Sequence, residues 1–201
     1  MKFFKLVLAL LPFASASPAL LKRGRFWLCQ GVFVQDNWLL TLKTCSAETV
    51  LDEKGRKSRI LEKVDSNSSD FALVKTQFSP APPVSLVADA EFPYEAVGQH
   101  MRITYKPRKR KQATRLFQVR HCGDLLCTGG RKIKKVRCAY RRGSPLNLDH
   151  HTDIVVGLVS NNGGCIRDRR FNVEFNKVRL EKPWMSAITG KELEKAPVLC
   201  D

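Results

Sequence analysis

The chain has 201 residues, of which 43% are hydrophobic and 27% are charged, with 35 Lys and Arg against 19 Asp and Glu. The hydrophobic fraction excludes an intrinsically disordered chain, and the length allows one domain, or two small packed barrels, with a real core. The formal net charge of +16 is large for a single domain and favours an anionic partner.

Residues 1–16 have the pattern of a secretory signal peptide. Lys2 and Lys5 lie at the start, an apolar run follows, and Ala14-Ser15-Ala16 provides a small-residue cleavage site. No later apolar run approaches the roughly 20 residues that a transmembrane helix needs. We therefore expect a mature chain, residues 17–201, that is secreted and has no transmembrane segment.

Short apolar runs between polar turns predict β-strands along most of the chain. The predicted strands are residues 26–28, 31–34, 38–42, 71–74, 84–87, 101–105, 116–119, 154–159 and 173–178. This pattern is typical of an antiparallel barrel or sandwich. The proline-rich residues 79–83 suit a linker between two halves, and residues 183–188 suit a helix that ends at Gly190.

Two kinds of covalent modification are expected in an exported chain. The seven cysteines are disulfide partners in the first instance, and the odd number leaves Cys200 as the candidate for an unpaired or intermolecular thiol. His121, Cys122 and Cys127 would make three zinc ligands without a fourth, so a Cys122–Cys127 disulfide is preferred, with no metal or cofactor. Asn67-Ser68-Ser69 is a sequon that predicts an N-glycan on Asn67.

The stretch Cys138-Ala-Tyr-Arg-Arg-Gly-Ser-Pro-Leu146 resembles the C-x-G-D-S-G-G-P-L signature of trypsin-like serine proteases. In that register Arg142 replaces the nucleophilic serine. Arg141 replaces the aspartate that, in active members of the family, forms an ion pair with a newly freed N-terminal amine. The reactive groups of the signature are therefore absent while its framework is retained.

Further blocks follow the order of the same family. Residues 31–45 resemble G-x-L-I-x-x-x-W-V-L-T-A-A-H-C, with Thr44 in the place of the catalytic histidine. Residues 69–75 resemble N-D-I-A-L-L-K and retain its aspartate as Asp70. Residues 157–165 resemble G-I-V-S-W-G-x-G-C, and residues 173–185 resemble the terminal strand and helix.

The resemblance implies an all-β fold of two packed antiparallel six-stranded barrels, shortened, with a short C-terminal helix. The N-terminal barrel would span about 26–78 and the C-terminal barrel about 84–201. Two disulfides are implied, Cys29–Cys45 and Cys138–Cys165. Asp70 is expected to be a buried carboxylate that, with no imidazole to orient, is left with local hydrogen bonding.

A hydrolase of this family needs a nucleophile, a base and oxyanion donors, and two of the three triad positions, Thr44 and Arg142, no longer supply them. The pocket positions Val136 and Asn161 also depart from the family, and no activation sequence follows Lys22-Arg23. The prediction is an inactive serine protease homologue.

The alternative is an enzyme with a rebuilt site. Ser144 is the serine that remains in the signature, but it lies two positions after that of the nucleophile. All four histidines of the chain lie outside the block that holds the triad histidine: His100, His121, His150 and His151. A lone histidine without a positioned nucleophile carries no reaction, so this alternative is disfavoured.

Two basic stretches account for much of the charge. One contains Lys106, Arg108, Lys109, Arg110 and Lys111, and the other contains Arg131, Lys132, Lys134, Lys135 and Arg137. The resemblance places both in loops around the former specificity pocket, beside Arg141 and Arg142. Such a face would bind sulfated glycosaminoglycan or another polyanion through counterion release, whereas the sparse aromatic residues argue against base stacking.

Other interpretations of the same residues remain open. The stretches equally fit solvated loops that confer solubility. Residues 106–111 and Lys22-Arg23 also fit sites for trypsin-like or furin-like cleavage. Analogy with inactive family members also allows a cofactor or decoy in an extracellular protease cascade, in immune or reproductive secretion. Its partner would be a protease or the substrate of one.

Overall fold

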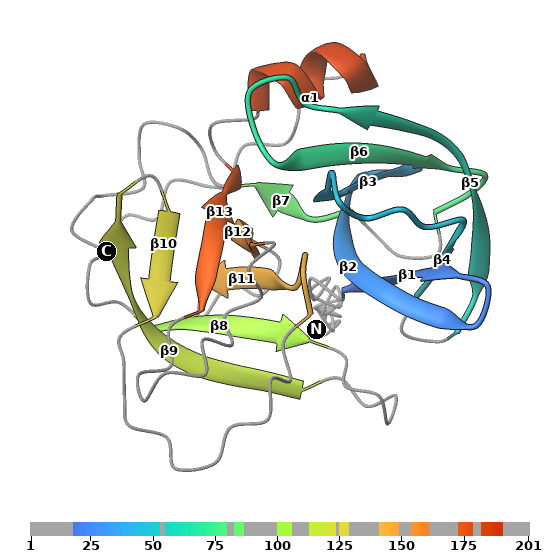
Figure 1. Cartoon of the computed structure of the whole chain (residues 1–201). Helices are drawn as coiled ribbons and strands as arrows, with labels where there is room; N and C mark the ends of the chain where they lie inside the picture. The colour runs from blue at the N-terminus through green and yellow to red at the C-terminus, as the bar shows by residue number, and fades with distance from the viewer. Residues whose placement is uncertain are drawn as a thin grey trace, which may run out of the picture.

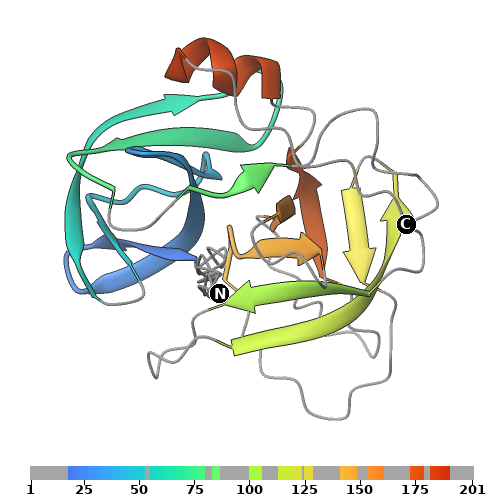
Figure 2. The ribbon, with the colours of Figure 1, turned by 180° about the vertical axis from the view of Figure 1, so that it is seen from behind.

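The computed structural model describes residues 18–52, 55–79, 83–86, 100–105, 113–123, 125–128, 141–148, 154–160, 173–178 and 182–190. Within these ranges the chain forms a closed barrel and a second sheet that lie side by side, with a short helix against the barrel (Figures 1 and 2). The predicted all-β fold with a C-terminal helix is confirmed. No helix in the described part is long and apolar enough to cross a membrane.

The closed barrel contains the first six strands in the order β1-β2-β3-β6-β5-β4, all paired antiparallel. Their bounds are β1 (Ala19–Arg23), β2 (Phe26–Gln35), β3 (Trp38–Leu42), β4 (Thr49–Leu51), β5 (Lys57–Asp65) and β6 (Phe71–Thr76). Gly31 in β2 is required by this packing, because a Cβ there would overlap the carbonyl oxygen of Leu40. Closure leaves no free strand edge in this half of the molecule.

The second sheet has the strand order β11-β8-β9-β10-β13-β12-β7, and a further pairing joins β11 to β12. Its strands are β7 (Ser85–Leu86), β8 (His100–Tyr105), β9 (Ala113–Cys122), β10 (Leu125–Thr128), β11 (Pro145–Leu148), β12 (Ile154–Val159) and β13 (Glu174–Lys177). β7 pairs with β12 in parallel, whereas the other pairings are antiparallel.

The helix α1 (Lys182–Thr189) has Pro183 in its first turn, where proline's lack of an N–H costs nothing. It ends at Gly190, whose φ of 70° is in the left-handed region and whose N–H donates to the carbonyl of Ser186 at 3.0 Å. Met185 faces inward and is fully buried. The helix is therefore held by one apolar face on the barrel.

Two apolar clusters explain why the halves hold together. One consists of barrel residues alone and includes Leu21, Phe33 and Leu39. The other joins Leu40 of the barrel to Leu158 of the second sheet and also includes Met185 of α1. Strand β3 has neighbours on both faces, so all five of its residues are buried and the usual alternation of apolar and polar side chains is absent.

The barrel differs from the prediction at its start. It begins at Ala19 rather than near residue 26, because the strand β1 precedes the predicted start and pairs with β2. The predicted strands 26–28 and 31–34 are parts of the single strand β2. Lys22 and Arg23, which the sequence allowed as an exposed cleavage site, lie within a barrel strand, where Arg23 is exposed. Strands β4, β5, β10 and β11 were also not predicted.

Candidate functional site

The segment 141–148 lies at the junction of the barrel and the second sheet. The N–H of Gln30 in β2 donates to the carbonyl of Arg142 at 2.8 Å, and the N–H of Gly143 donates to the carbonyl of Val159 in β12 at 2.9 Å. Gly143 has a φ of 78°, and a Cβ at this position would overlap the carbonyl oxygen of Gln30. The backbone position that corresponds to the nucleophile is thus fixed from both sides.

Thr44, Asp70 and Arg142 are the positions that the sequence motifs assign to the triad. Backbone hydrogen bonds and a disulfide of these residues or their chain neighbours hold the three positions near one another. The N–H of Lys43, next to Thr44, donates to the carbonyl of Asp70 at 2.8 Å. On the other side of Thr44, Cys45 forms a disulfide with Cys29, with 6.1 Å between their Cα atoms. Cys29 precedes Gln30, the partner of Arg142. The structure therefore contains the implied Cys29–Cys45 bond and places all three positions around the end of β3.

The side chain at Asp70 differs from the expectation of a buried carboxylate, because it is exposed. Its contribution to this site is its backbone carbonyl, which accepts the Lys43 N–H. A carboxylate is strongly solvated and stays in the interior when it has a partner there. At the position where the family motif has an imidazole, this chain has the shorter hydroxyl side chain of Thr44.

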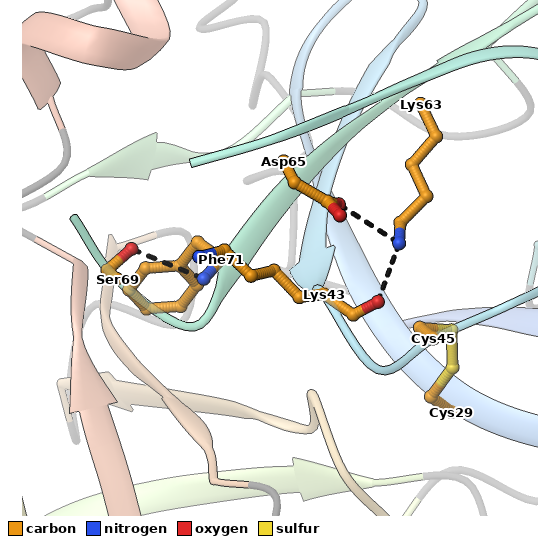
Figure 3. A network of polar contacts seen from close by, with 7 residues as sticks. All are labelled: Cys29, Lys43, Cys45, Lys63, Asp65, Ser69 and Phe71. Atoms are coloured by element: carbon orange, nitrogen blue, oxygen red, sulfur yellow. Dashed lines mark hydrogen bonds and ion pairs between the residues drawn. A yellow bond between two sulfur atoms is a disulfide. The ribbon is translucent and has the colours of Figure 1, made fainter. Parts of the chain in front are cut away.

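A lysine fixes the turn that carries Thr44 (Figure 3). Nζ of Lys63 donates to the carbonyl of Lys43 at 2.6 Å and lies 3.0 Å from Oδ1 of Asp65. Lys63 and Asp65 are two positions apart in β5 and therefore lie on the same face of the strand. This pair was not predicted from the sequence, although two opposite charges at period-two spacing are a signal for it.

Arg141 is a structural cation. Its Nη1 donates to the carbonyl of Trp27 at 2.8 Å, and its guanidinium carbon lies 5.7 Å from the centroid of the Trp27 ring. This distance is within the range of a cation–π contact. The guanidinium therefore ties segment 141–148 to β2.

Ser144 is fully buried, and its hydroxyl donates to Oε1 of Gln30 at 2.5 Å. The hydroxyl oxygen of Ser144 in turn accepts the backbone N–H of Arg141 at 3.3 Å. An amide oxygen is not a general base, so this hydrogen bond does not activate the serine. The geometry gives Ser144 a role in packing.

Other predicted residues are placed as follows. Cys122 and Cys127 form a disulfide between β9 and β10, with Cα atoms 6.0 Å apart, so these cysteines are not zinc ligands. In the described ranges no group of three His, Cys, Asp or Glu side chains is arranged to hold a metal ion. Asn67 is exposed in the bend between β5 and β6, where a glycan can be attached.

The two basic stretches lie outside the described residues. These comprise Lys106, Arg108, Lys109, Arg110 and Lys111, and Arg131, Lys132, Lys134, Lys135 and Arg137. Val136, Asn161, Cys138, Cys165, Cys200, His150 and His151 lie outside them too.

A sequence model of the trypsin family matches residues 15–185, whereas no curated protein matches the chain. Among solved structures, kallikrein-related peptidase 10 gives a TM-score of 0.71 at 14% identity, over 88% of this chain and 96% of its own. A collagenase gives 0.70 at 16% identity, over 89% and 94%. A mutant of human heparin binding protein gives 0.70 at 13% identity, over 87% and 92%. At these identities the structural likeness concerns the fold alone.

Proposed function

Because the chain belongs to the trypsin family, we propose that it is a secreted, non-catalytic member that acts by binding, with glycosaminoglycan or another polyanion as its partner. The proposal is carried by Arg142, a cation at the position that the sequence motif assigns to the nucleophile. Its backbone carbonyl accepts the N–H of Gln30. The β11–β12 pairing supports the second sheet as the second barrel of the family.

The surroundings of Arg142 support the loss of hydrolysis. Thr44 has no ring nitrogen to accept a proton, and Asp70 is exposed. Ser144, the serine left in the signature, is buried and bonded to an amide. Proton transfer in this family depends on a positioned nucleophile and base, and both residue types are replaced.

The charge of the chain supports a polyanion as the partner. The formal net charge is +16, and the two basic stretches would supply a field that concentrates anions. Heparin binding protein, which shares this fold, is named for such a ligand. Export of the chain would bring it into contact with sulfated polysaccharides at cell surfaces.

Heparin affinity chromatography tests this proposal. The wild-type protein should elute late in a salt gradient, and replacement of all five cations in residues 106–111 by Gln should shift elution strongly to lower salt. Two variants that each lose two positive charges test whether the location of the charge matters. Lys109→Gln/Lys111→Gln should elute earlier than Lys75→Gln/Lys177→Gln. Equal elution of these two variants would mean that only total charge matters, and weak retention of the wild type would refute the proposal.

A further inference from the structure

The turn between β1 and β2 carries a basic and aromatic surface that is separate from the two basic stretches. Gly24, with a φ of 55°, reverses the chain so that Arg23 pairs with Phe26 and Lys22 with Trp27. The side chain of Phe26 is 66% exposed, and no large hydrophobic residue in the described part is more exposed. The turn lies at the edge of the barrel away from the second sheet (Figures 1 and 2).

Cations surround these two rings. Nζ of Lys22 lies 5.7 Å from the centroid of the Trp27 ring, and the guanidinium carbon of Arg25 lies 5.8 Å from that of Phe26. Lys22 pairs with Thr49 of β4, which pairs with Arg59 of β5. Residues paired across strands share a face, so these three form a line across the outside of the barrel. The next pair, Arg23 and Phe26, points to the opposite face, so the two pairs meet only at the tip of the hairpin. We call the residues around this tip the hairpin surface: Lys22, Arg23, Arg25, Phe26 and Trp27.

The charge of the hairpin surface is only partly balanced. Glu48 is the acid that pairs with Arg23, at 3.5 Å, and both side chains are exposed. Exposed ion pairs of this kind are weak and exchange readily with other anions. Arg141 also lies against Trp27 and adds a cation from segment 141–148. The surface therefore favours a partner with many negative charges.

The exposed ring of Phe26 favours an anionic lipid bilayer over a sulfated polysaccharide as the partner of this surface. A sulfated polysaccharide would neutralise the cations but would leave the ring in water. An anionic bilayer provides phosphate and carboxylate groups for the cations and, just beneath them, an apolar boundary for an aromatic ring. We propose that the hairpin surface docks on an anionic lipid bilayer with Phe26 inserted among the headgroups. This goes beyond the proposed function, because both the surface and the partner differ.

Vesicle flotation tests this docking. The full mature protein should float with phosphatidylcholine vesicles that contain phosphatidylserine and should not float with phosphatidylcholine alone. Phe26→Ser should lower the partition coefficient about tenfold, because it removes apolar area without changing charge. Arg23→Gln/Arg25→Gln should lower it about 30-fold, from the attraction of about two cations to the surface.

The chain offers matched controls for both variants. Phe78→Ser removes an aromatic ring that is 47% exposed just beyond β6, the strand opposite β1 in the barrel. Lys75→Gln/Lys177→Gln removes two cations from β6 and β13. Phe78→Ser should float like wild type, and the lysine variant should lose less than the arginine variant. Far-ultraviolet circular dichroism checks that each variant is folded.

The outcomes separate this inference from the proposed function. Failure of the wild type to float with anionic vesicles at low salt, or unchanged flotation of Phe26→Ser, would overturn the docking. Earlier elution of Arg23→Gln/Arg25→Gln from heparin, together with unchanged flotation of Phe26→Ser, would assign the surface to polysaccharide instead. Weak heparin retention with intact flotation would contradict only the proposed function.

Discussion

Gly143 shows how one residue fixes the geometry of segment 141–148. Its φ of 78° is unfavourable for other residues, and a Cβ would overlap the Gln30 carbonyl oxygen. We expect Gly143→Ala to lower the free energy of unfolding by about 3 kcal/mol, because backbone strain and a steric clash act together. Urea denaturation followed by tryptophan fluorescence measures the change.

Gly24→Ala is the matched control for this prediction. Gly24 also has a positive φ, 55°, but a Cβ there would have no neighbour within 4 Å. Its replacement should therefore cost only the backbone term, about 1 kcal/mol. Equal losses in the two variants would show that contact with Gln30 does not constrain the segment.

At the scale of elements, β1 determines how the dibasic pair Lys22-Arg23 behaves. The strand pairs with β2 on one side and β4 on the other, and Ala19, Leu20 and Leu21 are buried. Because a protease binds an extended and accessible backbone, cleavage after Arg23 requires the strand to leave the barrel. We expect limited trypsin digestion of the native protein to spare this bond and to cut it in urea, as judged by mass spectrometry.

A native fragment that starts at Gly24 and still unfolds cooperatively would contradict this prediction. It would mean that β1 is dispensable and that the sequence-based alternative of processing at Lys22-Arg23 is correct. A synthetic peptide that spans residues 18–28 serves as the control for intrinsic susceptibility. Trypsin should cut it rapidly at the same bond.

At the scale of the whole molecule, apolar runs and motif order were sufficient to predict much of the fold. Strands β3, β6 and β12 and the helix α1 carry strong apolar patterns, and the predicted ranges agree closely with them. β5 was missed because most of its side chains are exposed, and β1 because its short Ala-Leu-Leu run follows the predicted signal peptide. A strand that is held mainly by its neighbours leaves little signal in sequence.

In the candidate site, too, some features could be predicted from the sequence and others could not. The replacements at Thr44 and Arg142 are predictions from alignment with a motif, which needs only the sequence. The contact of Arg141 with Trp27 and that of Lys63 with Lys43 join residues distant in the chain, and pairing across strands is needed to predict them. The exposure of Asp70 likewise depends on what neighbouring strands offer it.

The central claim is that this member of the trypsin family binds without cleaving, and reaction with a fluorophosphonate tests it most directly. This reagent bonds covalently to a serine only when a base and oxyanion donors activate the hydroxyl. The intact mass of the wild-type protein should remain unchanged after incubation, as should that of Ser144→Ala, while active trypsin gains the adduct. A stoichiometric adduct on the wild type that disappears in Ser144→Ala would contradict the account.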